Sequence, residues 1–396
     1  MIQDLLSKDK IRQKNHPRFL LVLVLTGLAL SGCATVKITY NNGNREAAQN
    51  VSTGIIKVEK NLLYGNVIAD ISIDKFNALG FNYGDSVDVK FSNGYTLEDI
   101  PYYTGYYTPA KEMLVLAYPG VEKIIIAQNY GALWDKSGLT DDDTVEISLD
   151  QPGKYRNVQE VLGKPYETDR KAFERDEEFS NYRSINTGRI RDGILYRSAS
   201  PCANKYNRAS YTDDLIKRDK IKTIIDLADG TEDIEAFINS DDYDSPYFRS
   251  LYEKGDVIPI NLAVDYTAEE YKEKLAVGLR AMIAADGPYL IHCLEGKDRT
   301  GFVAILLEAL TGATYDEMVA DYMTSYKNYY GLDRQSTPEA YEMIKSCHFD
   351  PAFRYILGAD SMADATTSDL EAGAEQYLIS CGLTKDEIRR LKEKLT

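Results

Sequence analysis

Histidine and cysteine are scarce in this chain, and their scarcity argues against two classes of protein. The 396 residues include three histidines and five cysteines. The sequence contains no CxxC pair and no histidine cluster, so a metal site rich in these ligands is not expected. Nothing suggests another cofactor. Five scattered cysteines are also too few for the disulfide framework of a small secreted domain.

Basic residues are outnumbered by acidic ones. Lys and Arg total 46 against 62 Asp and Glu, which gives a formal net charge of −16 at pH 7. A chain this acidic is repelled as a whole by nucleic acid and by anionic lipid surfaces. We therefore expect no nucleic-acid partner, and any anionic substrate has to bind in a local basic pocket.

Residues 1–33 have the layout of a bacterial secretion signal. Lysines and arginines precede the apolar run FLLVLVLTGLAL, and LSGC follows, ending at Cys33. LSGC resembles a lipobox, which implies cleavage before Cys33 and lipidation of its sulfur. The alternative is a transmembrane anchor, although the apolar run is shorter than the roughly 20 residues that a span needs. We expect an extracytoplasmic lipoprotein anchored in a bacterial membrane by its N-terminal lipid.

With Cys33 assigned to lipid, four cysteines remain. They are Cys202, Cys293, Cys347 and Cys381. Cys293 belongs to a motif described below. The other three allow either a disulfide or buried free thiols.

Two changes of pattern divide the first part of the chain. Residues 34–52 are polar and rich in Asn, as in NNGNREAAQN, which predicts a flexible tether. Residues 53–150 contain short apolar or alternating runs such as GNVIADISI, DSVDVKF and EKIIIAQN, separated by turn signals such as NYGD and SNGY. Short β-runs at this spacing predict a small all-β barrel or sandwich. We expect an accessory or binding module.

The same module resembles a known domain. YGNVIADISIDKFNALGFNYGDSVDVKF and QNYGALWDKSGLTDDDTVEISL are similar to the β-barrel C-terminal domain of the S-adenosylmethionine hydroxide adenosyltransferases. The shared features are a first strand with Gly-Asn, a Gly-Asp turn, an Asn-x-Gly-Ala helix start and a closing strand. The catalytic half of that family is not found before this segment, so the resemblance implies the fold and not the chemistry.

Residues 151–396 are expected to form a second domain. KTIIDLAD, VIPINLAVD and PYLIHC are short apolar runs, whereas TAEEYKEKLAVGLRAMIAADG and RTGFVAILLEALTG have helical spacing. Alternating strands and helices predict an α/β domain with a central parallel-type sheet flanked by helices. Ligands bind such sheets beyond the carboxyl ends of the strands. Asp229, Asp265 and Cys293 fall at these ends.

The stretch YLIHCLEGKDRTGF places a thiol where a phosphate can bind. Cys293 ends a strand, Gly296 permits a tight loop and Thr300 begins a helix. Backbone N–H groups from Leu294 to Arg299 can then converge on one point, which makes a cradle for a phosphate-sized dianion. The positive end of the helix and the nearby guanidinium both favour a thiolate, which is the nucleophilic form.

The other side chains of this stretch have matching roles. Arg299 can hold two equatorial phosphoryl oxygens through its planar fork. His292 would orient the loop by hydrogen bonds, and the Thr300 hydroxyl could stabilise the sulfur as it leaves. The remaining loop residues would line the substrate, namely Leu294, Glu295, Gly296 and Lys297.

The spacing His-Cys-x5-Arg-Thr is the signature of the cysteine-dependent protein tyrosine phosphatase superfamily. HCLEGKDRTG resembles the form found in bacterial tyrosine and dual-specificity phosphatases that also act on phosphoinositides. The resemblance implies an α/β phosphatase domain and a cysteinyl-phosphate intermediate on Cys293. The alternative is a buried structural cysteine with a surface arginine nearby by chance.

More of the chain supports this resemblance. NYRSINTGRIRDGILYRSASP is similar to the family pattern Asn-Phe-Arg-Asp followed by Gly-x-Leu-Tyr-Arg-Ser, which implies Arg197 as a further substrate-binding residue. IIDLAD resembles the family's Asp-Leu-Arg strand, and YLISCGLTKDEIRRLKEKL resembles its closing helix pair. Two positions depart from the pattern: Ser follows Arg183 where Asp is usual, and Ala follows Asp226-Leu227 where Arg is usual.

The leaving group needs a proton, and two carboxylates are candidates for supplying it. Asp265 ends an apolar strand in VDYT, where this superfamily has its general acid. Asp298 lies inside the phosphate loop, and in the GKDR subgroup the loop aspartate is suspected of this role. Either could instead be a capping or surface carboxylate. Lys297 adds charge beside Arg299, either to favour substrates with extra phosphates or as a solvated surface lysine.

We therefore expect a secreted, lipid-anchored phosphatase that hydrolyses phosphomonoesters, phosphotyrosine first among them, with a phosphorylated protein as its partner. One alternative is a phosphoinositide or inositol phosphate phosphatase. The other is a non-catalytic surface protein that only captures phosphate and works through its β-module.

Overall fold

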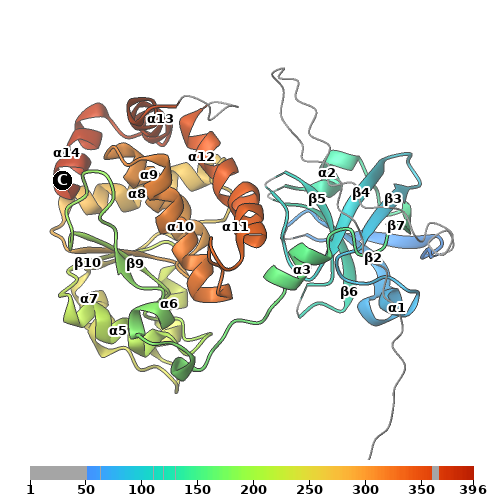
Figure 1. The fold of residues 1–396 in the computed structure, drawn as a ribbon, viewed down its shortest axis with the longest axis horizontal. Helices are drawn as coiled ribbons and strands as arrows, with labels where there is room; N and C mark the ends of the chain where they lie inside the picture. The colour runs from blue at the N-terminus through green and yellow to red at the C-terminus, as the bar shows by residue number, and fades with distance from the viewer. Residues whose placement is uncertain (1–50, 63, 110, 119, 130, 359–364) are drawn as a thin grey trace, which may run out of the picture. The chain divides into compact units, whose positions relative to one another are not determined.

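Seven strands between Ile56 and Gln151 close into a barrel (Figure 1). The computed structural model describes residues 51–396 except 63, 110, 119, 130 and 359–364, so the predicted signal peptide and Cys33 lie outside the described residues. The strands follow the order β1-β2-β6-β5-β4-β3-β7, and pairing of β7 with β1 closes the barrel. Their bounds are Ile56–Lys60 (β1), Val67–Ser72 (β2), Ser86–Phe91 (β3), Thr96–Tyr103 (β4), Met113–Leu116 (β5), Lys123–Gln128 (β6) and Thr144–Gln151 (β7).

Alternation of side chains explains why these segments form a barrel. Val87, Val89 and Phe91 of β3 are buried, whereas Lys90 between them is exposed. Successive side chains of a strand point to opposite faces, so every second residue fills the barrel interior. Two short helices accompany the strands, α1 (Ile73–Ala78) and α2 (Leu133–Ser137). The barrel expected from the sequence is confirmed.

The second domain is built on a five-stranded sheet with the order β11-β10-β12-β9-β8. Its strands are Arg183–Ser184 (β8), Leu195–Ser198 (β9), Thr223–Asp226 (β10), Val257–Pro259 (β11) and Tyr289–His292 (β12). β10 pairs in parallel with β11 and β12, and β12 pairs in parallel with β9. The short edge strand β8 runs antiparallel to β9, so the sheet is mixed. The carboxyl ends of four strands meet at one edge.

Helices and short helical turns make up most of the remaining chain of this domain. They are Arg156–Leu162 (α3), Arg170–Ala172 (η1), Asp176–Phe179 (α4), Ala209–Arg218 (α5), Thr231–Ile238 (α6), Pro246–Lys254 (α7), Glu269–Ala284 (α8), Asp298–Leu310 (α9), Tyr315–Tyr330 (α10), Pro338–Ile344 (α11), Lys345–Phe349 (η2), Asp350–Leu357 (α12), Thr367–Ser380 (α13) and Lys385–Leu395 (α14). Among the described residues, no helix combines the length and the apolar composition required to cross a membrane.

Adjacent strand residues contribute to two different apolar cores. Ile225 and Ile291 pack with side chains of α8, α9 and α13, whereas Ile224 and Leu290 pack with side chains of α5 and α7. The first core contains α9, which is apolar on all sides and buried along almost its whole length. A helix with that composition belongs inside a domain rather than on its surface. The start of α9 is therefore fixed beside the strand ends.

Candidate active site

Cys293 follows β12 directly, and five residues later α9 has begun. The thiol lies at the edge of the sheet formed by the strand ends, and the residue is 3% exposed. Gly296 turns the connecting loop with a φ of +65°, and a Cβ atom there would lie 2.1 Å from the carbonyl oxygen of Ser198. Only glycine allows both that conformation and that close approach to the end of β9. The cysteine, the tight loop and the helix start therefore occur in the predicted order.

Buried side chains hold the carbonyl groups of this loop from behind. The amide of Asn181 donates to the carbonyls of Glu295 (3.0 Å) and Gly296 (3.2 Å). The Arg197 guanidinium donates to Gly296 (2.9 Å) and to Lys297 (3.4 Å). In a planar trans peptide the N–H of the next residue points opposite to the carbonyl. Three successive N–H groups are therefore turned away from these side chains, toward the opposite side of the loop, where an anion would bind.

Arg197 supports the loop instead of contacting substrate. Its side chain is fully buried, and besides the two loop carbonyls it pairs with Asp321 of α10. Arg183 pairs with the other oxygen of the same carboxylate at 2.6 Å. The two arginines outweigh the effect of burial and lower the pKa of Asp321. The expectation that Arg197 binds substrate is thus replaced by a structural role beneath the loop.

Arg299 lies in the first turn of α9 and is half-buried. Its guanidinium donates to the carbonyl of Leu262 at 3.1 Å and to that of Ala228 at 3.4 Å. These carbonyls follow β11 and β10, so the arginine is held at the carboxyl ends of two strands. Ala228 is the residue that replaces the usual arginine of the family, and its backbone takes part in this contact.

His292 and Thr300 are buried on either side of the loop, and both have unpartnered polar atoms. Neither ring nitrogen of His292 has a hydrogen-bond partner, and its Nε2 lies 3.6 Å from Oδ2 of Asp226. Burial lowers the pKa of His292 to about 4 and raises that of Asp226 to about 7. A role of His292 in orienting the loop stays a prediction. The Thr300 hydroxyl is buried without a partner, which leaves it available to a sulfur or an anion.

The two candidate general acids differ in their surroundings. One oxygen of Asp265 accepts hydrogen bonds from the N–H (2.9 Å) and the hydroxyl (2.5 Å) of Thr267. Asp298 is the first residue of α9, and its side chain is 47% exposed. Desolvation raises the pKa of Asp298, and the Glu295 carboxylate adds to that effect against the opposing Lys297 ammonium. The raised pKa favours the protonated form of Asp298, which is the form that a general acid needs.

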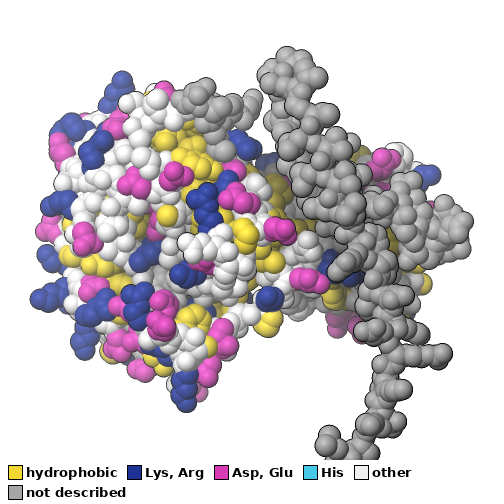
Figure 2. All heavy atoms as spheres, in the orientation of Figure 1, with side chains coloured by type: hydrophobic (Ala, Val, Ile, Leu, Met, Phe, Trp, Pro, Cys, Tyr) yellow, Lys and Arg dark blue, Asp and Glu magenta, His cyan; other side chains and the backbone are white. Residues whose placement is uncertain are grey.

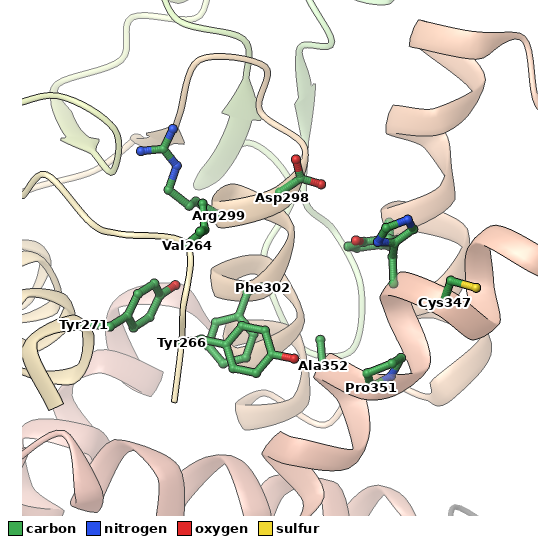
Figure 3. A pocket seen from close by; sticks show the side chains of 11 residues that line it. Val264, Tyr266, Tyr271, Asp298, Arg299, Phe302, Cys347, Pro351 and Ala352 are labelled. Carbon is green, nitrogen blue, oxygen red and sulfur yellow. The ribbon is translucent and has the colours of Figure 1, made fainter. Parts of the chain in front are cut away.

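A small recess opens beside the helix start (Figure 3). It measures about 40 Å³, and Asp298 and Arg299 both line it. Tyr266 and Phe302 form another wall, with their rings stacked 4.3 Å apart. His348 of the π-helix η2 lines it as well, and burial lowers the pKa of this histidine to about 4. The recess is therefore a mainly aromatic hollow with one acid and one guanidinium.

Lys297 is buried, so the alternative of a solvated surface lysine is wrong. The residue is 7% exposed, and its ammonium group lies 3.0 Å from a carboxylate oxygen of Glu295. Both residues were expected to line the substrate, whereas in the structure they pair with each other. Leu294 is half-buried, and its carbonyl accepts a hydrogen bond from the N–H of Ser200.

Several supporting residues were not predicted from the sequence. Asn181 and Arg183 stood inside a quoted family pattern, but no role was assigned to them. Asp321, Tyr166 and His348 gave no local signal, because each reaches the site from a distant part of the chain. In the ranges that the structure describes, no group of three His, Cys, Asp or Glu is placed to hold a metal ion. The four described cysteines are free thiols, so the disulfide alternative fails.

Comparison with known proteins agrees with this geometry. A tyrosine-protein phosphatase of Nostoc commune is 34% identical over 118 residues, which cover 28% of this chain and 40% of that protein. The triple specificity protein phosphatase PtpB of Mycobacterium tuberculosis is 29% identical over 127 residues, which cover 28% of this chain and 45% of PtpB. The chain thus spans less than half of the length of these relatives.

Among solved structures, TpbA of P. aeruginosa matches with a TM-score of 0.27 and 16% identity, over 46% of this chain and 87% of that one. The family model described as "Tyrosine phosphatase family" matches residues 175–396, which is more than half of the chain. That match includes the loop with Cys293 and Arg299 and the strands that carry it. The resemblance of the second domain to tyrosine phosphatases is confirmed, and the chain belongs to the tyrosine phosphatase family.

Proposed function

We propose that this protein is a cysteine-dependent phosphatase that hydrolyses phosphomonoesters, with phosphotyrosine in proteins as its main substrate. The observation that carries the proposal is the loop between Cys293 and Arg299, whose carbonyls are pinned from behind so that its N–H groups point the other way. A thiol at the base of such a loop is placed to attack a phosphorus atom bound in it.

The chemistry proceeds in two displacements. The Cys293 thiolate attacks phosphorus, a P–S bond forms, and the P–O bond to the leaving group breaks as that oxygen takes a proton from Asp298 or Asp265. Water then attacks phosphorus while the same carboxylate takes a proton from it, the P–S bond breaks, and the Cys293 thiolate and inorganic phosphate are released. Arg299 and the loop N–H groups stabilise the charge on the equatorial oxygens in both steps. The unpartnered Thr300 hydroxyl can donate to the sulfur as it leaves.

The proposed protein substrate agrees with the charge pattern of the molecule. Acidic and basic side chains are interspersed over the face shown in Figure 2, without a broad basic field that would attract a strongly anionic membrane or polyphosphate. We also propose that the mature protein is an extracytoplasmic lipoprotein, supported by the pattern of residues 1–33 alone. Cys33→Ala should then move the protein from the membrane fraction to the soluble fraction.

The direct test is phosphate release by the soluble protein without residues 1–33. A phosphotyrosine peptide, a phosphoserine peptide and a phosphoinositide panel would be compared, each with Cys293→Ser as the matched control. We expect release from the phosphotyrosine peptide that disappears in the variant. Preference for phosphoinositides would favour the lipid-phosphatase alternative. No release by folded, reduced protein would leave the non-catalytic phosphate-binding alternative.

A further inference from the structure

Lys297 of the phosphate loop is enclosed by aromatic rings and by two carboxyl groups, that of Glu295 and, at 3.8 Å, that of Asp298. Its ammonium nitrogen lies 3.0 Å from Oε2 of Glu295 and donates to the Tyr166 hydroxyl at 2.9 Å. The ring centroids of Tyr166, Tyr326 and Tyr330 are 5.4, 5.4 and 5.3 Å from the same nitrogen. Carboxylate pairing and cation–π contacts together satisfy a desolvated ammonium. The lysine is therefore buried, charged and already partnered.

Tyr166 completes this enclosure from outside the region matched by the family model. It lies between α3 and η1, and its hydroxyl donates to Oε2 of Glu295 at 3.0 Å and pairs with the Tyr330 hydroxyl at 3.0 Å. The backbone next to it is held by Arg208, whose guanidinium donates to the carbonyl of Glu167 at 2.9 Å. The segment that precedes the family domain thus contributes a side chain to the phosphate loop.

The enclosure changes the charge that a substrate meets. The loop carries two basic side chains, Lys297 and Arg299, and two acidic ones, Glu295 and Asp298. Glu295 neutralises Lys297 by contact, which leaves Arg299 and the N-terminus of α9 to bind one phosphate. A second phosphate on the same substrate would find no free cation among these four side chains, because Lys297 already lies against the carboxyl groups of Glu295 and Asp298.

We propose that Tyr166 and Glu295 sequester Lys297 and thereby restrict the site to monophosphorylated substrates whose remaining part is neutral or basic. The inference rests on the proposed function and names its substrate class: a phosphotyrosine peptide fits this description, and an inositol polyphosphate does not. Tyr166 and Glu295 determine specificity because they keep the Lys297 ammonium group from contacting the substrate.

The test compares two probes in matched variants. The ratio of kcat/KM for a myo-inositol bisphosphate to kcat/KM for 4-nitrophenyl phosphate would be measured in the wild type, Tyr166→Ala and Glu295→Gln. Tyr252→Ala is the control, because this half-buried tyrosine of α7 packs in the other apolar core. We expect the ratio to rise roughly fivefold in both test variants, the effect of one freed and partly solvated charge. The control should leave the ratio unchanged.

A ratio that stays constant in both test variants would overturn the proposal. Lysine labelling gives a second readout that does not depend on turnover: a succinimidyl ester should modify exposed Lys217 quickly and Lys297 slowly, and Tyr166→Ala should remove that protection. Equal labelling of both lysines in the wild type would also contradict the proposal. If the wild type hydrolyses neither probe, the proposed function fails. The inference about Lys297 is then tested by itself, by comparing the affinities of the same variants for inositol bisphosphate and for inorganic phosphate.

Discussion

The guanidinium of Arg299 is fixed by two backbone carbonyls at the ends of neighbouring strands. A lysine has no planar fork, so it cannot keep both contacts and still present two parallel N–H groups to a phosphoryl group. We expect Arg299→Lys to lower kcat about 100-fold to 1,000-fold, the usual effect of removing one donor to transition-state charge. Steady-state kinetics on 4-nitrophenyl phosphate would measure it.

Arg218→Lys is a suitable control for that experiment, because this arginine is exposed on α5 and pairs with the carboxylates of Glu177 and Asp219. It should leave kcat and KM unchanged. A rise in KM without a fall in kcat in Arg299→Lys would contradict the role given to Arg299, since it would show that the arginine binds ground state and transition state equally.

The identity of the general acid is a second question at the residue scale. We expect Asp298→Asn to reduce turnover on phenyl phosphate about 100-fold or more, and on 4-nitrophenyl phosphate much less, because a good leaving group needs no proton. Asp265→Asn serves as the matched comparison, since that carboxylate is engaged by Thr267. Equal losses on both substrates in Asp298→Asn would rule out this residue as the acid. If Asp265→Asn instead shows the larger loss on phenyl phosphate than on 4-nitrophenyl phosphate, Asp265 is the acid.

At the scale of elements, the phosphate loop depends on one buried carboxylate of α10. Asp321 accepts from Arg183 and Arg197, and Arg197 in turn holds two loop carbonyls. Replacing Asp321 with Asn would leave two buried guanidinium groups without a countercharge, which costs about 3–5 kcal/mol. We expect a matching loss in the free energy of unfolding in urea, together with loss of phosphatase activity.

Asp316→Asn provides the control for that change, because Asp316 is exposed in the first turn of the same helix. Its effect should stay within about 0.5 kcal/mol, as is usual for surface substitutions. If Asp321→Asn has the same free energy of unfolding as the wild type, the ion pairs of Asp321 with Arg183 and Arg197 are not needed to hold the loop.

The elements themselves were largely predictable, whereas their supporting contacts were not. The alternation in DSVDVKF predicts a barrel strand because inward and outward side chains differ in polarity along β3. Cys293, Gly296 and Arg299 could be assigned because their chemistry lies within one short stretch. Asn181 and Asp321 could not, since a buried hydrogen-bond network leaves no periodic signal in the sequence.

At the scale of the whole molecule, burial of carboxyl groups links stability to pH. Desolvation raises the pKa of Asp226 from its ordinary value of 3.8 to about 7. The folded state then keeps a proton that the unfolded state releases, so this group makes folding less favourable as the pH rises from about 4 to 7. His292 has the opposite effect, since its pKa is lowered to about 4 and the neutral form folds better as the pH rises toward 6.5.

Asp226→Asn separates these contributions, because asparagine stays neutral and can still accept the two backbone hydrogen bonds at this site. We expect the Tm of the variant relative to the wild type to increase as the pH rises from 4 to 7 and to level off above 7. The matching difference in the free energy of unfolding should change by about 1.4 kcal/mol per pH unit at its steepest. A Tm difference that is constant over this range would contradict the raised pKa.

The sequence by itself determined the barrel, the family and the placement of Cys293 and Arg299 at the two ends of one tight loop. Each of these depends on local spacing: alternation along a strand, or a cysteine and an arginine separated by one tight loop. Only the tertiary structure decided which charges face the substrate. In the structure Lys297 is buried against Tyr166. Arg197 lies under the loop and pairs with Asp321, which is distant from it in the sequence. The physical reason is that burial and pairing set the availability of a charge, and its partners come from distant parts of the chain.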